Sequence, residues 1–156
     1  MTPARLDHAD IEALIPHRGP MCLLDRMTSW DTTRIECVAV NHRDVRHPLR
    51  SASGLLASAA IEYAAQAMAV HGALSAAAAG DRAAPGFLAS ARDVRLACKR
   101  LDDLPRVDRD ELVVVAESQA ADATRLLYAF VLRHDGRELA SGRVAVVLDA
   151  GLAHAR

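Results

Sequence analysis

The chain has 156 residues, of which 51% are hydrophobic and 25% are charged, and its formal net charge is −1. This composition predicts one domain with a substantial core, and it excludes an intrinsically disordered chain. The near balance of charge argues against a general nucleic-acid-binding protein, which needs an excess of basic side chains to displace counterions.

The chain begins with a predicted short helix, residues 10–15, which ends at Pro16. A loop of residues 16–20 follows, and it starts and ends with proline. Proline fixes its own φ angle and restricts the residue before it, so this loop should be stiff. It carries His17, and a stiff loop is a good mount for a functional side chain.

Two strands are predicted next, over residues 21–27 and 34–40, with a turn between them at Asp31-Thr32. Residues 41–50 are polar and irregular in pattern. They separate these strands from the most unusual part of the chain.

Residues 54–80 contain twelve alanines and a single charged residue, Glu62. The length would allow a membrane span, but alanine is only weakly lipophilic, and Glu62, Gln66 and His71 would be costly inside a bilayer. A helix that is apolar on nearly every face is more simply a buried core helix. Since only 3% of all residues are aromatic, the core around it has to consist mainly of small and aliphatic side chains.

The second half of the chain supplies strands that can wrap this helix. The dipeptide Asp135-Gly136, between two apolar runs, is a strong signal for a tight hairpin. Two strands, one long helix and four strands predict an α+β fold with an antiparallel sheet packed on the helix. We expect the tail after Asp149 to be frayed. The four predicted strands are residues 87–98, 111–119, 124–133 and 137–148.

The three cysteines, Cys22, Cys37 and Cys98, are odd in number and form no CxxC pair. This suits ordinary thiols in a reducing compartment. Residues 1–10 lack an apolar segment typical of a secretory signal. We therefore expect a cytoplasmic protein.

Two segments resemble one known family. Residues 15–26 (Ile-Pro-His-Arg-Gly-Pro-Met-Cys-Leu-Leu-Asp-Arg) resemble the start of the β-hydroxyacyl-acyl carrier protein dehydratases, which have a similar Pro-His-Arg loop and an apolar strand ending in Asp-Arg. Residues 61–67 (Ile-Glu-Tyr-Ala-Ala-Gln-Ala) resemble the helix motif of that family. The resemblance covers residues 8–148 and is closest to the divergent branch of aryl-polyene-type gene clusters. It implies the hot-dog fold, a long helix wrapped by a curved antiparallel sheet, as a single domain of residues 1–156.

The resemblance implies dehydration of a 3-hydroxyacyl thioester, bound to acyl carrier protein, to the trans-2-enoyl thioester in fatty-acid-like or polyene biosynthesis. The reaction needs a base for the α-proton, and a neutral imidazole suits this near pH 7. Standard members carry that histidine in a Gly-His-Phe-Pro-Gly loop, whereas residues 46–51 (Arg-His-Pro-Leu-Arg-Ser) keep His47 without the glycine frame. The base is therefore either His17 or His47. We favour His17, because its loop is stiffer and is the better retained motif in the divergent branch.

The leaving hydroxyl needs a proton, and Glu62 is the candidate acid, because burial makes a carboxyl hold its proton more tightly. The alternative is a structural ion pair between Glu62 and an arginine. Backbone N–H groups of Gly54 and Leu55, at the expected start of the helix, are candidates for stabilising the enolate oxygen. Gln66 lies one helical turn after Glu62 and could orient it or line the acyl pocket. His47 is a further candidate for binding substrate.

A basic cluster, Arg92, Arg95 and Lys99, lies in one predicted strand and at its end, with Arg95 and Lys99 expected on one face. We interpret it as a landing patch for an acidic acyl carrier protein; the alternative is a solvated sheet face. Because exposed sheet edges need cover, a homodimer is expected, or a heterodimer with another hot-dog protein, with active sites built from both chains. No cofactor is expected. A metal site is not expected either, because the histidines lack ligand spacing.

Two rival functions remain open at this stage. A hot-dog acyl thioesterase can work with a helix carboxylate and water, without a histidine base. A non-catalytic subunit could instead bind acyl chains or complete a heterodimer. The altered loop around His47 keeps the second alternative open.

Overall fold

The computed structural model describes residues 4–149, so the predicted fraying after Asp149 lies outside the described residues. The chain order is α1 (His8–Leu14), a 3-10 turn (Gly19–Met21), β1 (Arg26–Trp30), β2 (Arg34–Ala39), a second 3-10 turn (Ala57–Ala59), α2 (Ala60–Ala78), β3 (Gly86–Leu96), β4 (Leu112–Ala121), β5 (Arg125–His134) and β6 (Arg137–Leu148).

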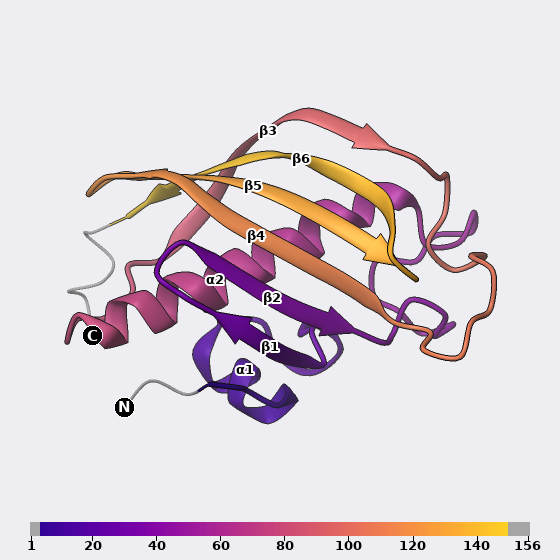
Figure 1. Ribbon diagram of the computed structural model, residues 1–156, viewed down its shortest axis with the longest axis horizontal. Coiled ribbons are helices and arrows are strands. Elements are labelled where there is room, and N and C mark those ends of the chain that lie inside the picture. The colour runs from indigo at the N-terminus through magenta and orange to yellow at the C-terminus, as the bar shows by residue number, and fades with distance from the viewer. Residues whose placement is uncertain (1–3, 150–156) are drawn as a thin grey trace.

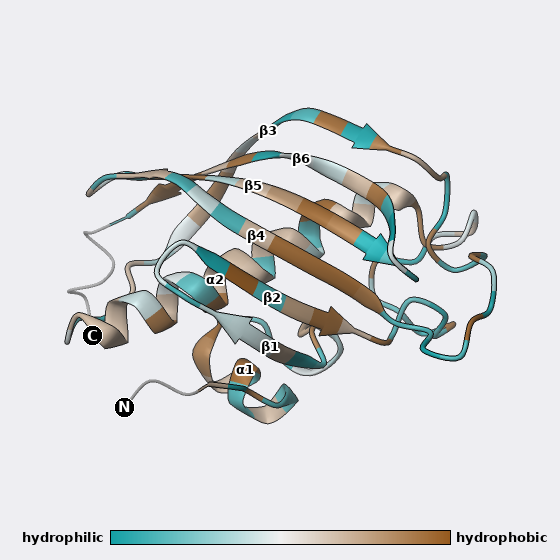
Figure 2. Cartoon of the chain, viewed as in Figure 1, coloured by the Kyte–Doolittle hydropathy of each residue, from teal (hydrophilic) through white to brown (hydrophobic). Residues whose placement is uncertain are grey.

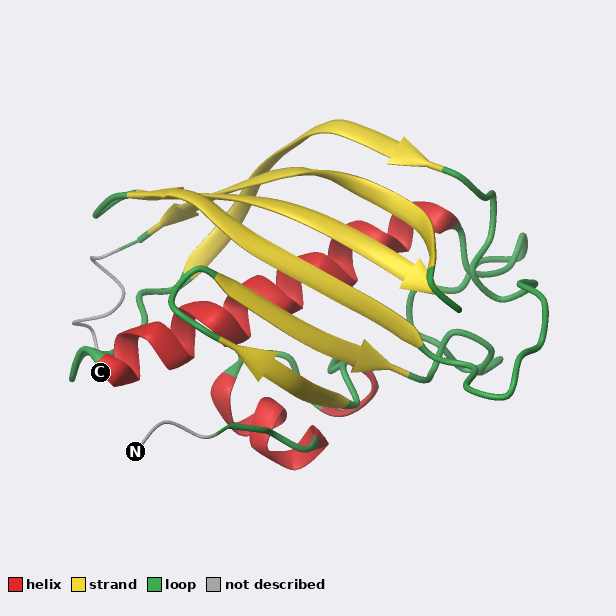
Figure 3. Cartoon of the chain, in the orientation of Figure 1, coloured by secondary structure: helices red, strands yellow, loops and turns green. Residues whose placement is uncertain are grey.

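The six strands form one antiparallel sheet in the order β1-β2-β4-β5-β6-β3. The sheet curves over α2, which crosses beneath it, and α1 lies next to β1 (Figure 1). The same arrangement, one long helix under a curved sheet, is clear when elements are coloured by type (Figure 3). The predicted hot-dog fold is therefore confirmed.

The core lies between the concave face of the sheet and α2. Hydrophobic residues run along the central strands β2, β4 and β5 above the helix (Figure 2). On the helix, the buried side chains include Tyr63, Met68 and Val70 among small alanines. The alanines let the backbones of sheet and helix approach closely, as the low aromatic content predicts.

Local sequence signals account for the short connections. The side chain of Asp7 caps α1 by accepting a hydrogen bond from the N–H of Asp10, and Asp10 returns the bond to the N–H of Asp7. Asp135 and Gly136 both have positive φ angles, of 49° and 75°. That conformation is the one a type I′ hairpin requires, so the predicted β5–β6 turn is confirmed.

Two predicted element boundaries are wrong. The strand expected over residues 21–27 is a 3-10 turn followed by irregular chain, and β1 begins only at Arg26. Cys22, Leu23 and Leu24 are buried in this irregular stretch. Their side chains therefore pack in the core although their backbone does not join the sheet. The long helix expected from residue 54 begins at Ala60, because the residues before it form a separate loop.

None of the helices within residues 4–149 has the length and apolar character that a membrane span requires.

The helix α2 is less enclosed than its sequence predicts. A stripe of α2 remains partly exposed in the single chain. It consists of residues one helical turn apart, namely Ile61, Glu62, Ala65, Ala69, Gly72, Ala73 and Ala76.

The strand β3 forms an open edge of the sheet, since β6 is its hydrogen-bonded neighbour on one side only. Phe87, Leu88 and Leu96 are exposed on it. An exposed apolar edge strand is normally covered by another chain or by charged residues.

Candidate active site

His17 and Glu62 meet at the start of α2. The Nε2 atom of His17 lies 3.2 Å from Oε1 of Glu62. The side chains are 28% and 31% exposed, so solvent and substrate can reach the pair. The expectation that Glu62 is fully buried is therefore wrong. The alternative that pairs it with an arginine is also wrong, since among residues 4–149 the basic side chain paired with Glu62 is His17.

The other nitrogen of His17 points into the protein. Its Nδ1 atom is shielded from solvent and has no hydrogen-bond partner among residues 4–149. Chemistry at this ring must therefore run through Nε2, the atom that faces Glu62.

Gln66 holds Glu62 in place from one helical turn away. Its side-chain nitrogen donates to Oε1 of Glu62 over 3.1 Å and to the carbonyl of Met21 over 2.8 Å. Its side-chain oxygen accepts from the N–H of Leu23 over 2.8 Å. Both ends of this fully buried amide are thus fixed by backbone groups that follow the His17 loop. Of the two roles predicted for Gln66, this geometry matches the orienting one.

The loop that carries His17 is tied to α1. The guanidinium of Arg18 donates hydrogen bonds to the backbone carbonyls of Glu12 and Ile15. Gly19 has a positive φ of 56°, which lets the chain turn into the 3-10 segment. The loop is thus held by hydrogen bonds as well as by its prolines.

His47 lies in a different setting. It is buried, and it is the first member of a chain of hydrogen bonds that continues through Tyr63 to Asn41. The hydroxyl of Tyr63 donates to Oδ1 of Asn41 over 2.7 Å, so the Nε2–H of His47 must donate to that hydroxyl, 2.9 Å away. The Nδ1 atom accepts from the N–H of Leu49 over 3.1 Å. Burial lowers the pKa of His47 from its ordinary value of 6.5. Both ring nitrogens are therefore occupied in the neutral form.

Gly54 and Leu55 do not lie at a helix N-terminus, contrary to expectation. The N–H of Gly54 donates to the carbonyl of Ser51, and the N–H of Leu55 donates to Oδ1 of Asp102. Asp102 also accepts from Arg50 and Arg100, and Arg100 is the main cause that holds the pKa of this carboxyl far below its usual range. These two N–H groups serve the fold and are not free for an enolate oxygen.

A hollow of about 410 Å³ opens beside the pair, on the side of Glu62. Its lining comes from the loop before α2 and from the first turn of the helix. The apolar side chains there are suited to contact with an acyl chain. The lining includes Leu49, Leu56, Ala59, Ile61 and Glu62, with the hydroxyls of Ser51 and Ser58.

The predicted carrier patch is exposed but is not one regular strand face. Arg92, Arg95 and Lys99 are all exposed. Pairing between β3 and β6 is irregular between Arg92 and Arg95, with Asp93 at a positive φ of 53°, and β3 ends at Leu96. Lys99 therefore lies beyond the strand, and strand alternation does not place it on one face with Arg95.

His71 is a further buried histidine, and its hydrogen bonds were not predicted from the sequence. His71 in α2 accepts at Nδ1 from the hydroxyl of Tyr128 over 2.6 Å and donates from Nε2 to the carbonyl of Asp31 over 2.8 Å. Burial lowers the pKa of His71. The ring thus connects the helix to β5 and to the β1–β2 turn, which is a structural role.

A family model for ApeP-like proteins, described as ApeP dehydratase, matches residues 9–154. The chain belongs to the ApeP-like dehydratase family. No curated protein matches it. The match spans both the His17 loop and the helix that carries Glu62.

Solved structures with the same fold include dehydratases and thioesterases. The dehydratase heterocomplex ApeI:P from Xenorhabdus doucetiae matches with a TM-score of 0.77 and 21% identity, covering 92% of this chain and 93% of that chain. A thioesterase from Haemophilus influenzae matches with a TM-score of 0.65 and 11% identity, covering 97% and 96%. Thioesterase superfamily member 2 from zebra fish matches with a TM-score of 0.61 and 13% identity, covering 92% and 99%. At these identities the matches establish the fold alone.

Proposed function

We propose that this dehydratase converts a 3-hydroxyacyl thioester on acyl carrier protein to the trans-2-enoyl thioester, in fatty-acid-like or polyene biosynthesis, with His17 as base and Glu62 as acid. The observation that carries the proposal is the 3.2 Å contact between Nε2 of His17 and Oε1 of Glu62, with the carboxylate held by Gln66. An imidazole and a carboxyl side by side can act on the α-proton and on the hydroxyl oxygen of the substrate, which are only three bonds apart.

The pair can balance every proton of the reaction. Neutral His17 takes the α-proton, and the electrons of the broken C–H bond form the new double bond. The bond from the β-carbon to the hydroxyl oxygen breaks, and the protonated carboxyl of Glu62 supplies the proton that makes water. The site is then left with an imidazolium and a carboxylate, and a proton passing from His17 to Glu62 restores the starting state.

His17 suits the role of base better than His47. An effective base must come within hydrogen-bond reach of the proton it removes. Both nitrogens of His47 already have partners inside the protein, and the ring is 5% exposed. We assign His47 to the support of the loop before α2, through Tyr63.

A thioesterase is the second candidate, because thioesterases share the fold and Glu62 could activate a water. A direct assay separates the candidates. Purified protein is given a 3-hydroxyacyl thioester on acyl carrier protein, and the products are resolved by mass spectrometry. Enoyl thioester supports dehydration, free acid supports a thioesterase, and unchanged substrate supports a non-catalytic subunit.

The open edge at β3 supports assembly with a second hot-dog chain. Two such edges can pair and bury Phe87, Leu88 and Leu96. We propose a homodimer, with a heterodimer as the alternative that the match to a dehydratase heterocomplex supports. Light scattering of the purified chain at micromolar concentration should give twice the monomer mass. A clean monomer that is inactive alone, and gains activity with a second hot-dog subunit, would favour the heterodimer.

The acyl carrier protein would dock on the exposed basic residues Arg92, Arg95 and Lys99. Opposite charge speeds encounter and is screened by salt. Replacing all three with glutamate should raise the KM for the carrier-bound substrate while leaving the rate with a short thioester lacking the carrier unchanged. Equal effects on both substrates would contradict this docking surface.

A further inference from the structure

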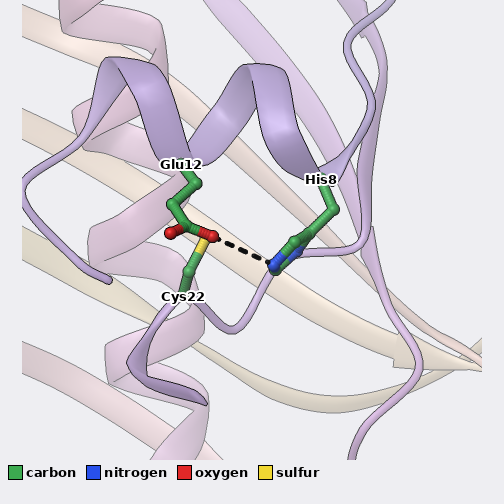
Figure 4. Close-up of side chains that lie close together, drawn as sticks. All are labelled: His8, Glu12 and Cys22. Carbon is green, nitrogen blue, oxygen red and sulfur yellow. Dashed lines mark ion pairs between the residues drawn. The ribbon is translucent and has the colours of Figure 1, made fainter. Parts of the chain in front are cut away.

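A second group of chemically reactive side chains is formed by residues that precede and follow the His17 loop in the chain. His8 and Glu12 project from one face of α1, and Cys22 comes from the chain just after the 3-10 turn (Figure 4). One ligand-type atom of each residue lies within 4.8 Å of the others, and Nε2 of His8 is 3.5 Å from Oε2 of Glu12. In the chain, the His17 loop lies between α1, which precedes it, and Cys22, which follows it.

The ring of His8 is oriented for metal binding. Its Nδ1 lies 2.7 Å from the carbonyl of Leu24, and a carbonyl can only accept, so Nδ1 carries the hydrogen. In the neutral ring the lone pair is then on Nε2, the atom that faces Glu12 in Figure 4. A ligating histidine typically donates its other N–H to a backbone carbonyl or carboxylate in this way.

We propose that His8, Glu12 and Cys22 bind a single divalent transition-metal ion of the zinc type. Imidazole, carboxylate and thiolate are the three side-chain ligands that zinc accepts. With the usual bond lengths, tetrahedral ligand atoms lie about 3.3–3.7 Å apart, so the His8–Glu12 distance already fits. The Cys22 sulfur, within 4.8 Å of the other two ligand atoms, has to move inward to complete the set, and the fourth position is left to water.

The charges around the three residues allow a cation. The nearby guanidinium of Arg18 bonds to the backbone carbonyls of Glu12 and Ile15, and not to the Glu12 carboxylate. Without an ion, burial and the Glu12 charge raise the pKa of the Cys22 thiol. Binding therefore releases the thiol proton as the Cys22 sulfur becomes a ligand.

A second histidine–carboxylate group is a weaker candidate. His42, Asp110 and His134 also bring ligand atoms together. There, however, Arg43 donates to both oxygens of Asp110, over 2.5 and 3.0 Å, so a fixed positive charge already neutralises the carboxylate. We assign that group to the structural connection between the loop after β2 and β5.

An ion bound by His8, Glu12 and Cys22 would crosslink α1 to the chain that follows the His17 loop. It would therefore hold both ends of the segment that carries His17 in place. The inference does not depend on the proposed dehydration, because the site would bind metal whether or not the protein is active.

The test is a cobalt titration of the purified, reduced and chelator-treated protein. Saturable one-to-one binding should appear with a sulfur-to-cobalt charge-transfer absorption. Cys22→Ser should remove this absorption, His8→Ala should weaken binding about tenfold or more, and the matched Cys98→Ser variant should behave like the original chain. In parallel, zinc should raise the melting temperature of the original chain and of Cys98→Ser, but not of Cys22→Ser, since a ligand that binds only the folded state stabilises it.

Melting curves without metal establish that each variant is folded before it is titrated. Absence of saturable binding in the original chain would overturn the proposal. So would an unchanged cobalt spectrum in Cys22→Ser. Loss of binding in a folded His134→Gln variant, with binding retained in His8→Ala, would also overturn it and place the ion at the other group.

Discussion

The Nε2 atom of His17 lies 3.2 Å from Oε1 of Glu62, and both residues belong to the same chain. The first comes from a proline-bracketed loop and the second from the first turn of α2, so the fold itself brings the two together. These two side chains do not need a partner subunit to meet. A second chain would instead cover the open edge at β3.

The first prediction separates the two histidines. His17→Ala should lower kcat by about 10²-fold or more, the usual scale for losing general acid–base help, with little change in melting temperature because the ring is partly exposed. His47→Ala should lower the melting temperature by removing the buried hydrogen bond that the Tyr63 hydroxyl accepts, while kcat per folded molecule changes less. Steady-state kinetics and thermal melts of both variants check this ranking. The opposite ranking of kcat would assign the base to His47.

The second prediction concerns the amide that positions Glu62. Gln66→Met keeps the size of the side chain but leaves the N–H of Leu23 and the carbonyl of Met21 unpaired, at a cost of about 1–3 kcal/mol for a stranded buried group. The Glu62 carboxylate also loses the hydrogen bond that holds it in position. The value of kcat should therefore fall about tenfold or more, since small misplacements of a catalytic group are costly. Gln119→Met, on an exposed position of β4, is the control and should change neither quantity. An unchanged kcat in folded Gln66→Met would contradict the positioning role.

The sequence predicted those parts of the fold that depend on local signals. The Asp135-Gly136 hairpin, the second strand and the order of elements are all correct, because turn residues and period-two apolar patterns act over a few residues. The contact between His17 and Glu62 was not predictable from spacing. The motif resemblance suggested both residues, but not that they meet within one chain.

Two of the incorrect predictions have one physical origin. An apolar run such as residues 21–27 is compatible with a buried strand and with a buried loop. Which of the two forms depends on the hydrogen-bond partners available to its backbone. Here the side chain of Gln66 supplies those partners to Met21 and Leu23, so no strand is needed. In the same way Asp102, distant in sequence, takes the N–H of Leu55 that otherwise would have been available at a helix start.

The third prediction is a loss of stability in mild acid. Burial lowers the pKa of His47 and of His71 below the ordinary value of 6.5. As the pH falls through about 6.5, the unfolded chain binds protons that the folded chain does not, so the free energy of unfolding falls. Above that pH these residues contribute no pH dependence.

Melting temperatures between pH 7.5 and 5.5 should therefore drop by several degrees. His71→Gln keeps a donor and an acceptor but does not titrate, and it should flatten part of the slope. The carboxyls of Asp102 and Asp110, whose pKa values are strongly lowered, chiefly by Arg100 and Arg43, cannot cause a loss in this window. A flat profile would contradict the neutral, buried state of these rings.

The fourth prediction tests whether Gly54 serves the fold or the substrate. Gly54 has φ of +95°, and an added Cβ would lie 2.6 Å from Nε of Arg100 and 2.8 Å from Oδ1 of Asp102. Gly54→Ala should therefore lose about 1–3 kcal/mol of stability from the backbone conformation, with more from the clash. Gly80→Ala, at φ +76° with open space around it, is the control and should lose less. If folded Gly54→Ala loses activity without losing stability, Gly54 binds substrate after all.

The last prediction concerns Glu62, the charge retained in an otherwise apolar helix. Glu62→Gln keeps the shape and a hydrogen-bonding end but removes the acidic proton, so dehydration should fall by about 10²-fold or more. The melting temperature should stay nearly unchanged, because the pair is partly exposed and glutamine keeps a hydrogen-bonding end next to Nε2 of His17. Glu36→Gln offers a matched control, since the Glu36 side chain is also 31% exposed and is paired, but with Arg34 in the same strand, β2. This change should alter stability slightly and activity not at all. A marked drop in the melting temperature of Glu62→Gln, with activity retained in the folded fraction, would make the pair structural and remove Glu62 from the chemistry.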